Sequence, residues 1–263
     1  MTLRISLLTL LLMLAGCGAR SPESRGPTTG SARCQPGEAE RWSEDVEVSC
    51  VAEGVWVFVA LAPEDFVYPR YPANGLLLES DGRSVLVDTG WRDAHAESLI
   101  AFARERGHPI AAAMATHAHD DRVGGVAALQ AAGIPVFATA ETIALAEQAH
   151  VTVPDHVLVP GALGDVEWLF PGAGHSPDNL VVWHPSSRTL FGGCLIKGLD
   201  ATSLGHVAEA DPVAWPLALD AVREAYPDPA RVVPGHGAIG GMELLAHTAS
   251  LLRAESTEAV AGP

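Results

Sequence analysis

Lysine is nearly absent from this 263-residue chain: Lys197 is the only one, and the other 15 basic residues are arginines. Positive charge is scarce altogether, because 32 Asp and Glu residues against 16 Lys and Arg give a formal net charge of -16. A nucleic-acid-binding protein needs a basic face that displaces counterions from phosphates, so the composition argues against nucleic acid as a partner. Hydrophobic residues make up 48% of the chain, which argues against a disordered protein and predicts a folded domain.

The N-terminal hydrophobic run, residues 5–15, is too short to cross a membrane, because a bilayer needs about 20 apolar residues. With Arg4 before it and small residues after it, the run is typical of an export signal. Leu14-Ala-Gly-Cys17 resembles the cleavage box of bacterial lipoproteins, in which the cysteine carries the lipid. The alternative is an ordinary signal peptide in which this cysteine occurs by chance.

We therefore expect a lipoprotein-type signal peptide at residues 1–16 and a lipid on Cys17. Gly18 rather than Asp follows the cysteine, which by the same resemblance implies a periplasmic protein anchored to the outer membrane. Residues 17–45 are rich in Gly, Ser, Pro, Arg and Glu and predict a flexible tether. Residues 46–263 are then one domain, and we expect a tethered monomer.

Cysteine is also rare, with four residues in the chain. Export places the domain in an oxidising compartment, where disulfides persist. If Cys17 carries lipid and Cys194 is engaged elsewhere, Cys34 and Cys50 remain to pair. The alternative is two free thiols.

The order of elements predicts an α/β protein. Two hairpins come first, formed by residues 46–51 with 55–61 and 76–79 with 84–87, and helices and strands alternate after them. Strand pairs followed by helices, twice over, favour a four-layer αββα sandwich of two mixed β-sheets flanked by helices. The further helices are expected at residues 93–106, 123–132, 139–150, 211–225 and 242–253. The further strands are expected at residues 110–115, 136–137, 157–159, 166–170, 180–183, 189–191 and 231–233.

Four segments carry metal-binding side chains at the ends of predicted strands. In His117-Ala-His119-Asp-Asp121, residues two apart project to the same side of extended backbone and can converge. His175, Cys194 and His236 each lie on a Gly-flanked loop after a strand. One such element alone is explained by chance, a capping Asp or a buried thiol, but all four together predict a metal site. Thiolate, imidazole and carboxylate form a ligand set that zinc accepts.

These motifs resemble those of a metallo-β-lactamase. The resemblance runs from about Gly54 to Leu252 and includes Val87-Asp-Thr-Gly-Trp91, Pro-Gly-Ala-Gly-His175, Gly-Gly-Cys194 and Pro-Gly-His236-Gly. Where the wider superfamily has a His and a bridging Asp, this chain has Arg122 and Cys194. That combination resembles the dizinc subclass B1 rather than hydroxyacylglutathione hydrolases, lactonases or ribonucleases.

The resemblance implies two Zn²⁺ ions per chain, one held by three imidazoles and the other by a carboxylate, a thiolate and an imidazole. It implies hydrolysis of the β-lactam amide bond of penicillins, cephalosporins and carbapenems by a zinc-bound hydroxide, without an acyl-enzyme, and hence antibiotic resistance. The first ion would be bound by His117, His119 and His175, and the second by Asp121, Cys194 and His236.

Further residues are expected to act with Asp121 in catalysis or to bind substrate. Lys197, three residues after Cys194, corresponds to the position that binds the substrate carboxylate in the family. His206 replaces the usual Asn, which can donate a hydrogen bond towards the lactam carbonyl, and predicts a narrower or pH-sensitive activity. The apolar loop at residues 62–74 is expected to form a flap over apolar substituents. Its aromatic residues and a neighbouring tryptophan are the candidate contacts: Phe66, Tyr68, Tyr71 and Trp91.

Two other functions remain open at this stage. One is a dizinc hydrolase of the same fold that acts on another ester, thioester or lactone. The other is a lipid-anchored zinc-binding protein without turnover. Lys197 and the Cys194 ligand speak against the first, and the complete ligand set against the second. Lone histidines such as His95 are interpreted as surface or helix residues without a role.

Overall fold

The computed structural model describes residues 33–261, with side chains up to residue 255. The predicted signal peptide, Cys17 and the first part of the predicted tether lie outside the described residues. Within the described part, no helix is both long and apolar enough to span a bilayer.

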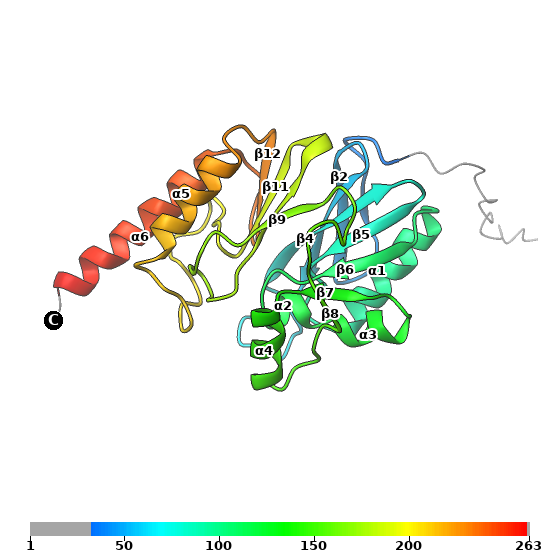
Figure 1. The fold of residues 1–263 in the computed structure, drawn as a ribbon, viewed down its shortest axis with the longest axis horizontal. Coiled ribbons are helices and arrows are strands. Elements are labelled where there is room, and N and C mark those ends of the chain that lie inside the picture. Colours follow the sequence, from blue (N-terminus) through cyan, green and yellow to red (C-terminus); the bar gives the residue numbers. More distant parts are fainter. Residues whose placement is uncertain (1–32, 262–263) are drawn as a thin grey trace, which may run out of the picture. The chain divides into compact units, whose positions relative to one another are not determined.

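Two β-sheets form the centre of the folded unit (Figure 1). The larger sheet has eight strands in sequence order, antiparallel from β1 to β5 and parallel from β5 to β8. The smaller sheet has the order β12-β11-β10-β9 and is antiparallel except for the parallel pair β11 and β12. The strands are β1 (Ala39–Arg41), β2 (Val46–Ala52), β3 (Val55–Leu61), β4 (Pro72–Ser80), β5 (Arg83–Val87), β6 (Ile110–Met114), β7 (Val136–Ala138), β8 (His156–Val157), β9 (Glu167–Leu169), β10 (Val181–His184), β11 (Thr189–Gly193) and β12 (Arg231–Pro234).

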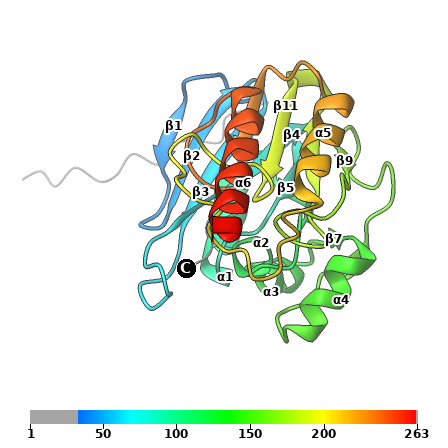
Figure 2. The same ribbon diagram turned by 90° about the vertical axis from the view of Figure 1, so that its left-hand side faces the viewer.

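Helices cover the outer faces of both sheets (Figures 1 and 2). Both faces of the larger sheet are hydrophobic and must be covered. In strand β3, Trp56 and Phe58 face one hydrophobic cluster, and Val55 and Val57 face another. The first cluster includes residues of α1 and α3, the second lies between the sheets, and a third joins the smaller sheet to α5 and α6. The predicted four-layer sandwich is therefore confirmed. The helices are α1 (Asp93–Glu105), α2 (Asp120–Val123), α3 (Val126–Ala131), α4 (Ala140–Gln148), α5 (Trp215–Ala225), α6 (Glu243–Ala261) and the 3₁₀ turn η1 (Pro185–Ser187).

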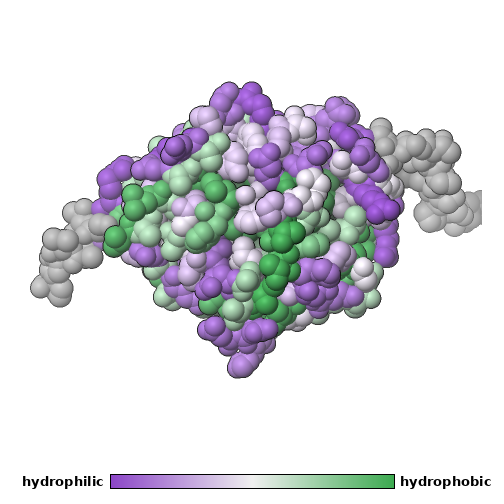
Figure 3. All heavy atoms as spheres, viewed as in Figure 1, coloured by the Kyte–Doolittle hydropathy of each residue, from purple (hydrophilic) through white to green (hydrophobic). Residues whose placement is uncertain are grey.

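The outer surface of this unit is mixed in polarity. Figure 3 shows hydrophilic residues over much of one face and a hydrophobic area over α5, where Leu217 is 70% exposed. The abundance of hydrophilic surface agrees with the strongly negative net charge of the chain.

The folded unit begins earlier than predicted. Cys34 is buried and forms a disulfide with Cys50 of β2, and β1 pairs with β2. The prediction of a tether reaching residue 45 is therefore wrong for residues 34–45, and the alternative of two free thiols is excluded. A three-residue edge strand in a Gly-, Pro- and Glu-rich context carries too weak a periodic signal to be found in the sequence.

One predicted helix, residues 123–132, is divided into α2 and α3 by Gly124 and Gly125. A side chain at Gly124 would place its Cβ atom 2.3 Å from the backbone of Trp91, and one at Gly125 would reach 2.6 Å from the Thr89 carbonyl oxygen. The two glycines therefore allow the chain after His119 to pass directly against the loop after β5.

The Cys34–Cys50 disulfide closes a loop with a sequence separation of 16 residues. We expect the double variant Cys34→Ser/Cys50→Ser to lose about 3 kcal/mol of unfolding free energy, because a loop of this size restricts the unfolded chain by that amount. Urea unfolding of the zinc-loaded proteins measures the loss. Wild type under reducing conditions should match the variant, and an unchanged free energy in both would show that the disulfide does not stabilise the fold.

Candidate metal centre and active site

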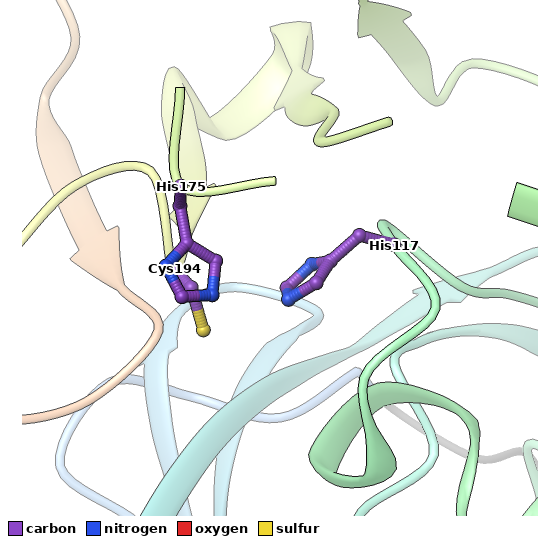
Figure 4. Close-up of side chains that lie close together, drawn as sticks. All are labelled: His117, His175 and Cys194. Atoms are coloured by element: carbon purple, nitrogen blue, oxygen red, sulfur yellow. The ribbon is translucent and has the colours of Figure 1, made fainter. Parts of the chain in front are cut away.

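The candidate metal ligands lie on loops at the ends of strands from both sheets. His117 and His119 follow β6, His175 lies on the loop between β9 and β10, Cys194 follows β11 directly, and His236 follows β12. In Figure 4, His117, His175 and Cys194 point towards one another from separate segments. The packing of the two sheets thus brings together residues that are more than 100 positions apart in the sequence.

All six side chains predicted as ligands lie in one cluster. Three overlapping groups each have their nitrogen, sulfur or oxygen ligand atoms within 4.8 Å of one another: His117 with His175 and Cys194, His117 with His119 and Asp121, and Asp121 with Cys194 and His236. Because each group shares members with another, the six residues form one continuous centre.

The three-histidine half presents nitrogen atoms to a common point. His119 Nδ1 lies 3.1 Å from His175 Nε2, and the buried His117 Nε2 has no hydrogen-bond partner within residues 33–261. Burial lowers the pKa of His117 and of His175 well below the ordinary value. These imidazoles are therefore neutral near pH 7, which is the form that binds a metal ion.

Outer contacts orient two of these rings. His117 Nδ1 lies 3.2 Å from Thr116 Oγ1, and His119 Nε2 lies 2.6 Å from Glu209 Oε2. Such contacts fix which ring nitrogen faces the metal position. The arrangement leaves His117 Nε2, His119 Nδ1 and His175 Nε2 as the atoms suited to hold an ion.

The second half combines a carboxylate, a thiol and an imidazole. His236 Nε2 lies 3.3 Å from Cys194 Sγ and 3.3 Å from Asp121 Oδ2, while its Nδ1 donates to the Pro72 carbonyl oxygen at 2.6 Å. Burial opposes ionisation of Asp121, but the adjacent Arg122 guanidinium holds the pKa of this carboxyl well below its usual range. The ionised Asp121 carboxylate, the Cys194 sulfur and the His236 nitrogen together form a donor set that fits zinc.

Arg122 is fully buried and connects this half to the body of the protein. Its Nη2 lies 2.6 Å from Asp121 Oδ2 and donates to Cys194 Sγ at 2.9 Å, and its Nη1 donates to Asp88 Oδ2 at 3.0 Å. Asp88 in turn accepts from the backbone nitrogen and the hydroxyl of Thr116, at 2.8 and 3.1 Å. From the sequence, Arg122 was singled out only as part of the family resemblance, whereas in the structure it positions two candidate ligands.

A pocket of about 910 Å³ opens over the centre and is lined by five of the six candidate ligands. Its remaining wall contains every residue predicted to bind substrate, together with residues that the sequence did not indicate, notably Glu209 of the loop before α5 and Leu145 and Gln148 of α4. The predicted substrate residues in the wall are Phe66, Tyr68, Tyr71, Trp91, Lys197 and His206.

Aromatic rings form one side of the pocket. The ring of Tyr71 lies 4.8 Å from that of His236, and the ring of Phe66 lies 4.7 Å from that of Trp91. Tyr68 is 65% exposed and Tyr71 44% exposed. Apolar area thus lies open directly beside the metal centre.

The pocket wall also contains Lys197 and His206. Lys197 is 9% exposed, and its Nζ lies 5.4 Å from the centre of the Trp215 ring. Burial lowers the pKa of Lys197, while Cys194 and Asp121 act in the other direction. The His206 ring lies 5.6 Å from that of His119. Both side chains therefore line the pocket that opens over the metal centre.

Two residues outside the pocket lining support its walls: Trp215, which the sequence did not indicate, and His95, which was interpreted as a residue without a role. Trp215 donates from Nε1 to the Leu195 carbonyl oxygen at 2.9 Å, and its ring lies 5.9 Å from that of His175. His95 is buried in α1 and accepts a hydrogen bond from the backbone nitrogen of Trp91 at 3.1 Å. A tryptophan or histidine inside a helix has no local feature that distinguishes such a contact, so only the tertiary structure reveals it.

The sandwich fold and the six-residue centre define a metalloenzyme of the αββα class. A family model described as "Metallo-beta-lactamase superfamily" matches residues 68–236. The chain belongs to this superfamily, whose relatives imply zinc as the metal.

Curated relatives and solved structures agree with this assignment. The metallo-beta-lactamase type 2 of Bacteroides fragilis is 34% identical over 80% of this chain and 86% of its own length, and that of Bacillus cereus is 35% identical over 79% and 83%. The crystal structure of the metallo-beta-lactamase FIM-1 from Pseudomonas aeruginosa in its mono-zinc form superposes with a TM-score of 0.77 at 35% identity, covering 82% of this chain and 99% of that one.

We expect zinc to stabilise the folded protein, because an ion that binds only the native state adds about 4 kcal/mol when its free concentration exceeds the dissociation constant 1,000-fold. A chelator should lower the unfolding temperature and zinc should restore it. Cys194→Ser should bind less zinc and show a smaller shift, whereas His156→Gln, a change at a surface histidine paired with Asp155, should behave as wild type. Equal unfolding temperatures with and without chelator would contradict a metal centre.

Proposed function

We propose that this protein hydrolyses the β-lactam amide bond of penicillins, cephalosporins and carbapenems in a zinc-dependent reaction and thereby gives antibiotic resistance. The observation that carries the proposal is the convergence of all six ligand side chains in one cluster, five of which line a pocket whose wall also contains Lys197. Relatives that are named metallo-beta-lactamases cover most of the chain. Bound zinc supplies a Lewis acid that polarises a carbonyl group and makes water acidic enough to attack it near neutral pH.

The residues of this chain bind and orient the substrate. Lys197 places its ammonium group beside the Cys194 half of the centre and binds the carboxylate of the lactam. His206, on the far side of His119, donates a hydrogen bond towards the lactam carbonyl oxygen. The aromatic side chains of the flap cover apolar substituents of the substrate, and Glu209 keeps the His119 ring in the orientation that presents Nδ1 to the metal.

The ligand set supports two zinc ions, as in subclass B1. His117, His119 and His175 form a neutral set that leaves an ion strongly Lewis-acidic, while Asp121, Cys194 and His236 bring negative charge to the other. With Arg122 beside Asp121 and Cys194, the second set is held in place before metal arrives.

We further propose that the mature protein is a monomer anchored to the outer membrane and facing the periplasm. The lipoprotein-like sequence Leu14-Ala-Gly-Cys17 and the following Gly18 support the anchor. The Cys34–Cys50 disulfide supports an oxidising compartment.

The decisive experiment measures hydrolysis of a chromogenic cephalosporin by the purified protein before and after chelation, and after zinc is added back. We expect activity to disappear with the chelator and to return with zinc. A penicillin, a carbapenem, a lactone and a thioester complete the panel. Turnover of the lactone or thioester but of no β-lactam would assign the protein to another reaction, and bound zinc without any turnover would make it a binding protein.

Lys197 should control the affinity for substrates that carry a carboxylate. We expect Lys197→Glu to raise KM by about 10- to 100-fold, the range for loss of a hydrogen bond to a charged group, with a smaller change in kcat. Substrates whose carboxylate is esterified should not distinguish the variant from wild type. Arg253→Glu, the same charge change on the outer helix α6, is the matched control and should leave KM unchanged.

The single lysine offers a second readout that does not depend on turnover. An amine-reactive reagent can label only Lys197 and the N-terminal amine, and a bound carboxylate ligand should slow labelling of Lys197. Equal KM values for Lys197→Glu and wild type, together with labelling that the ligand does not affect, would remove Lys197 from the binding site.

A further inference from the structure

Asp45 lies outside the pocket, between β1 and β2, yet it contacts both ends of the flap. In the structure the flap comprises residues 62–71 rather than the expected 62–74, because β4 begins at Pro72. At the N-terminal end, the backbone nitrogen of Leu61 donates to the Asp45 carbonyl oxygen at 2.9 Å. At the C-terminal end, Arg70 Nη1 donates to Asp45 Oδ1 at 3.1 Å. One residue thus holds the two points at which the flap leaves and rejoins the sheet.

The second carboxylate oxygen of Asp45 binds a different segment. Asp45 Oδ2 pairs with Arg92 Nη2, and Arg92 directly follows Trp91. The Trp91 indole donates to the Ala60 carbonyl oxygen at 3.1 Å and carries Phe66 of the flap against its ring. Asp45 therefore connects the flap with the tryptophan on which the flap rests.

The conformation of Arg70 shows that this attachment constrains the backbone. Arg70 has a φ angle of 55°, in the left-handed region that residues with a side chain adopt only when their surroundings hold them there. Its backbone nitrogen donates to the Ala62 carbonyl oxygen at 3.1 Å, and the nitrogen of Ala62 donates to Tyr71 at 2.9 Å. The Arg70 side chain is held by Asp45 and by Glu64, the latter at 3.3 Å. It thereby keeps the two ends of the flap together.

The Asp45 side chain is better shielded than a typical surface carboxylate. It is 18% exposed, compared with 46% for Glu47, which pairs with Arg41 across the neighbouring β1–β2 hairpin. The Asp45 partners Arg70 and Arg92 are 37% and 43% exposed, so salt still screens both pairs. Glu47 thereby offers a matched control on the same hairpin that does not touch the flap.

We propose that Asp45 is a positioning residue that holds the flap over the pocket and so sets the affinity for ligands that the flap covers. The effect on substrate affinity rests on the proposed function, whereas the effect on the flap itself does not. A loop that must be ordered on binding opposes association through lost conformational freedom. Anchoring both ends before the ligand arrives removes part of that penalty.

The first test measures hydrogen–deuterium exchange of peptides from residues 62–71 in the zinc-loaded protein. Asp45→Asn should accelerate exchange in the flap, Glu47→Gln should not, and added salt should move wild type towards the variant. Arg70→Gln removes the Arg70–Asp45 pair by changing the arginine instead of the carboxylate, and it should accelerate exchange in the same way. This second variant keeps the test possible if Asp45→Asn does not fold. Unchanged exchange in Asp45→Asn, or in Arg70→Gln if that variant alone folds, would overturn the proposal whether or not the protein hydrolyses β-lactams.

The second test asks whether Asp45 acts through the flap. For a lactam with a large apolar substituent, Asp45→Asn should raise KM about two- to fivefold, the range for loss of a partly exposed ion pair, and leave kcat unchanged. In a Phe66→Ala background, where the flap no longer rests on Trp91, the same substitution should have little further effect. An equal increase in KM in both backgrounds would mean that Asp45 only supports the fold.

Discussion

The buried guanidinium of Arg122 is the interaction on which the rest of the site depends. A charge without solvent access must be paired, and losing one partner of such a pair costs about 3–5 kcal/mol. Its partners come from five places: the Asn74 carbonyl oxygen in β4, Asp88 after β5, Asp121 in α2, Cys194 after β11 and the Gly235 carbonyl oxygen after β12. Satisfying this one cation therefore fixes how the two sheets meet. Because two carboxylates and a thiol face it, negative charge remains available for a metal ion.

The same logic explains how an acidic protein can attract an anionic substrate. The surface charge acts through water and salt and is screened beyond about 10 Å, whereas Lys197 acts at contact distance within a largely buried environment. Trp215 supports the ammonium group with its ring, and Asp121 and Cys194 favour its charged form. Zinc held by those two groups would neutralise them and leave Lys197 to bind the carboxylate that we propose as its ligand.

The sequence predicted those parts of the protein that local pattern determines. The ligands were found because His117, His119 and Asp121 share one short motif and because glycines mark the loops of His175, Cys194 and His236. Glu209 and Asp45 were missed, because each acts through partners that are distant in the sequence. The residues next to them contain no motif that predicts those partners. Asp45 was even assigned to a flexible tether, because its segment is polar and the strand before it, β1, is three residues long. Pairing across the fold, rather than composition, decides the role of such residues.

The site thus consists of a rigid base and an adjustable wall. The base is buried and over-determined: His117 is fixed by Thr116, Thr116 by Asp88, and Asp88 by Arg122, so the ligand geometry does not depend on the substrate. The flap is different, because Tyr68 and Tyr71 are exposed and contact the body of the protein at few points. A rigid base gives the same reaction with every substrate, and a partly free wall accepts different substituents. Asp45 belongs to neither part, but it joins the flap to the Trp91 segment and so limits how far the wall can adjust. A more mobile wall would accept a broader range of substrates, and a more firmly held wall would bind each of them more tightly. The contacts of Asp45 therefore set a balance between substrate range and binding strength.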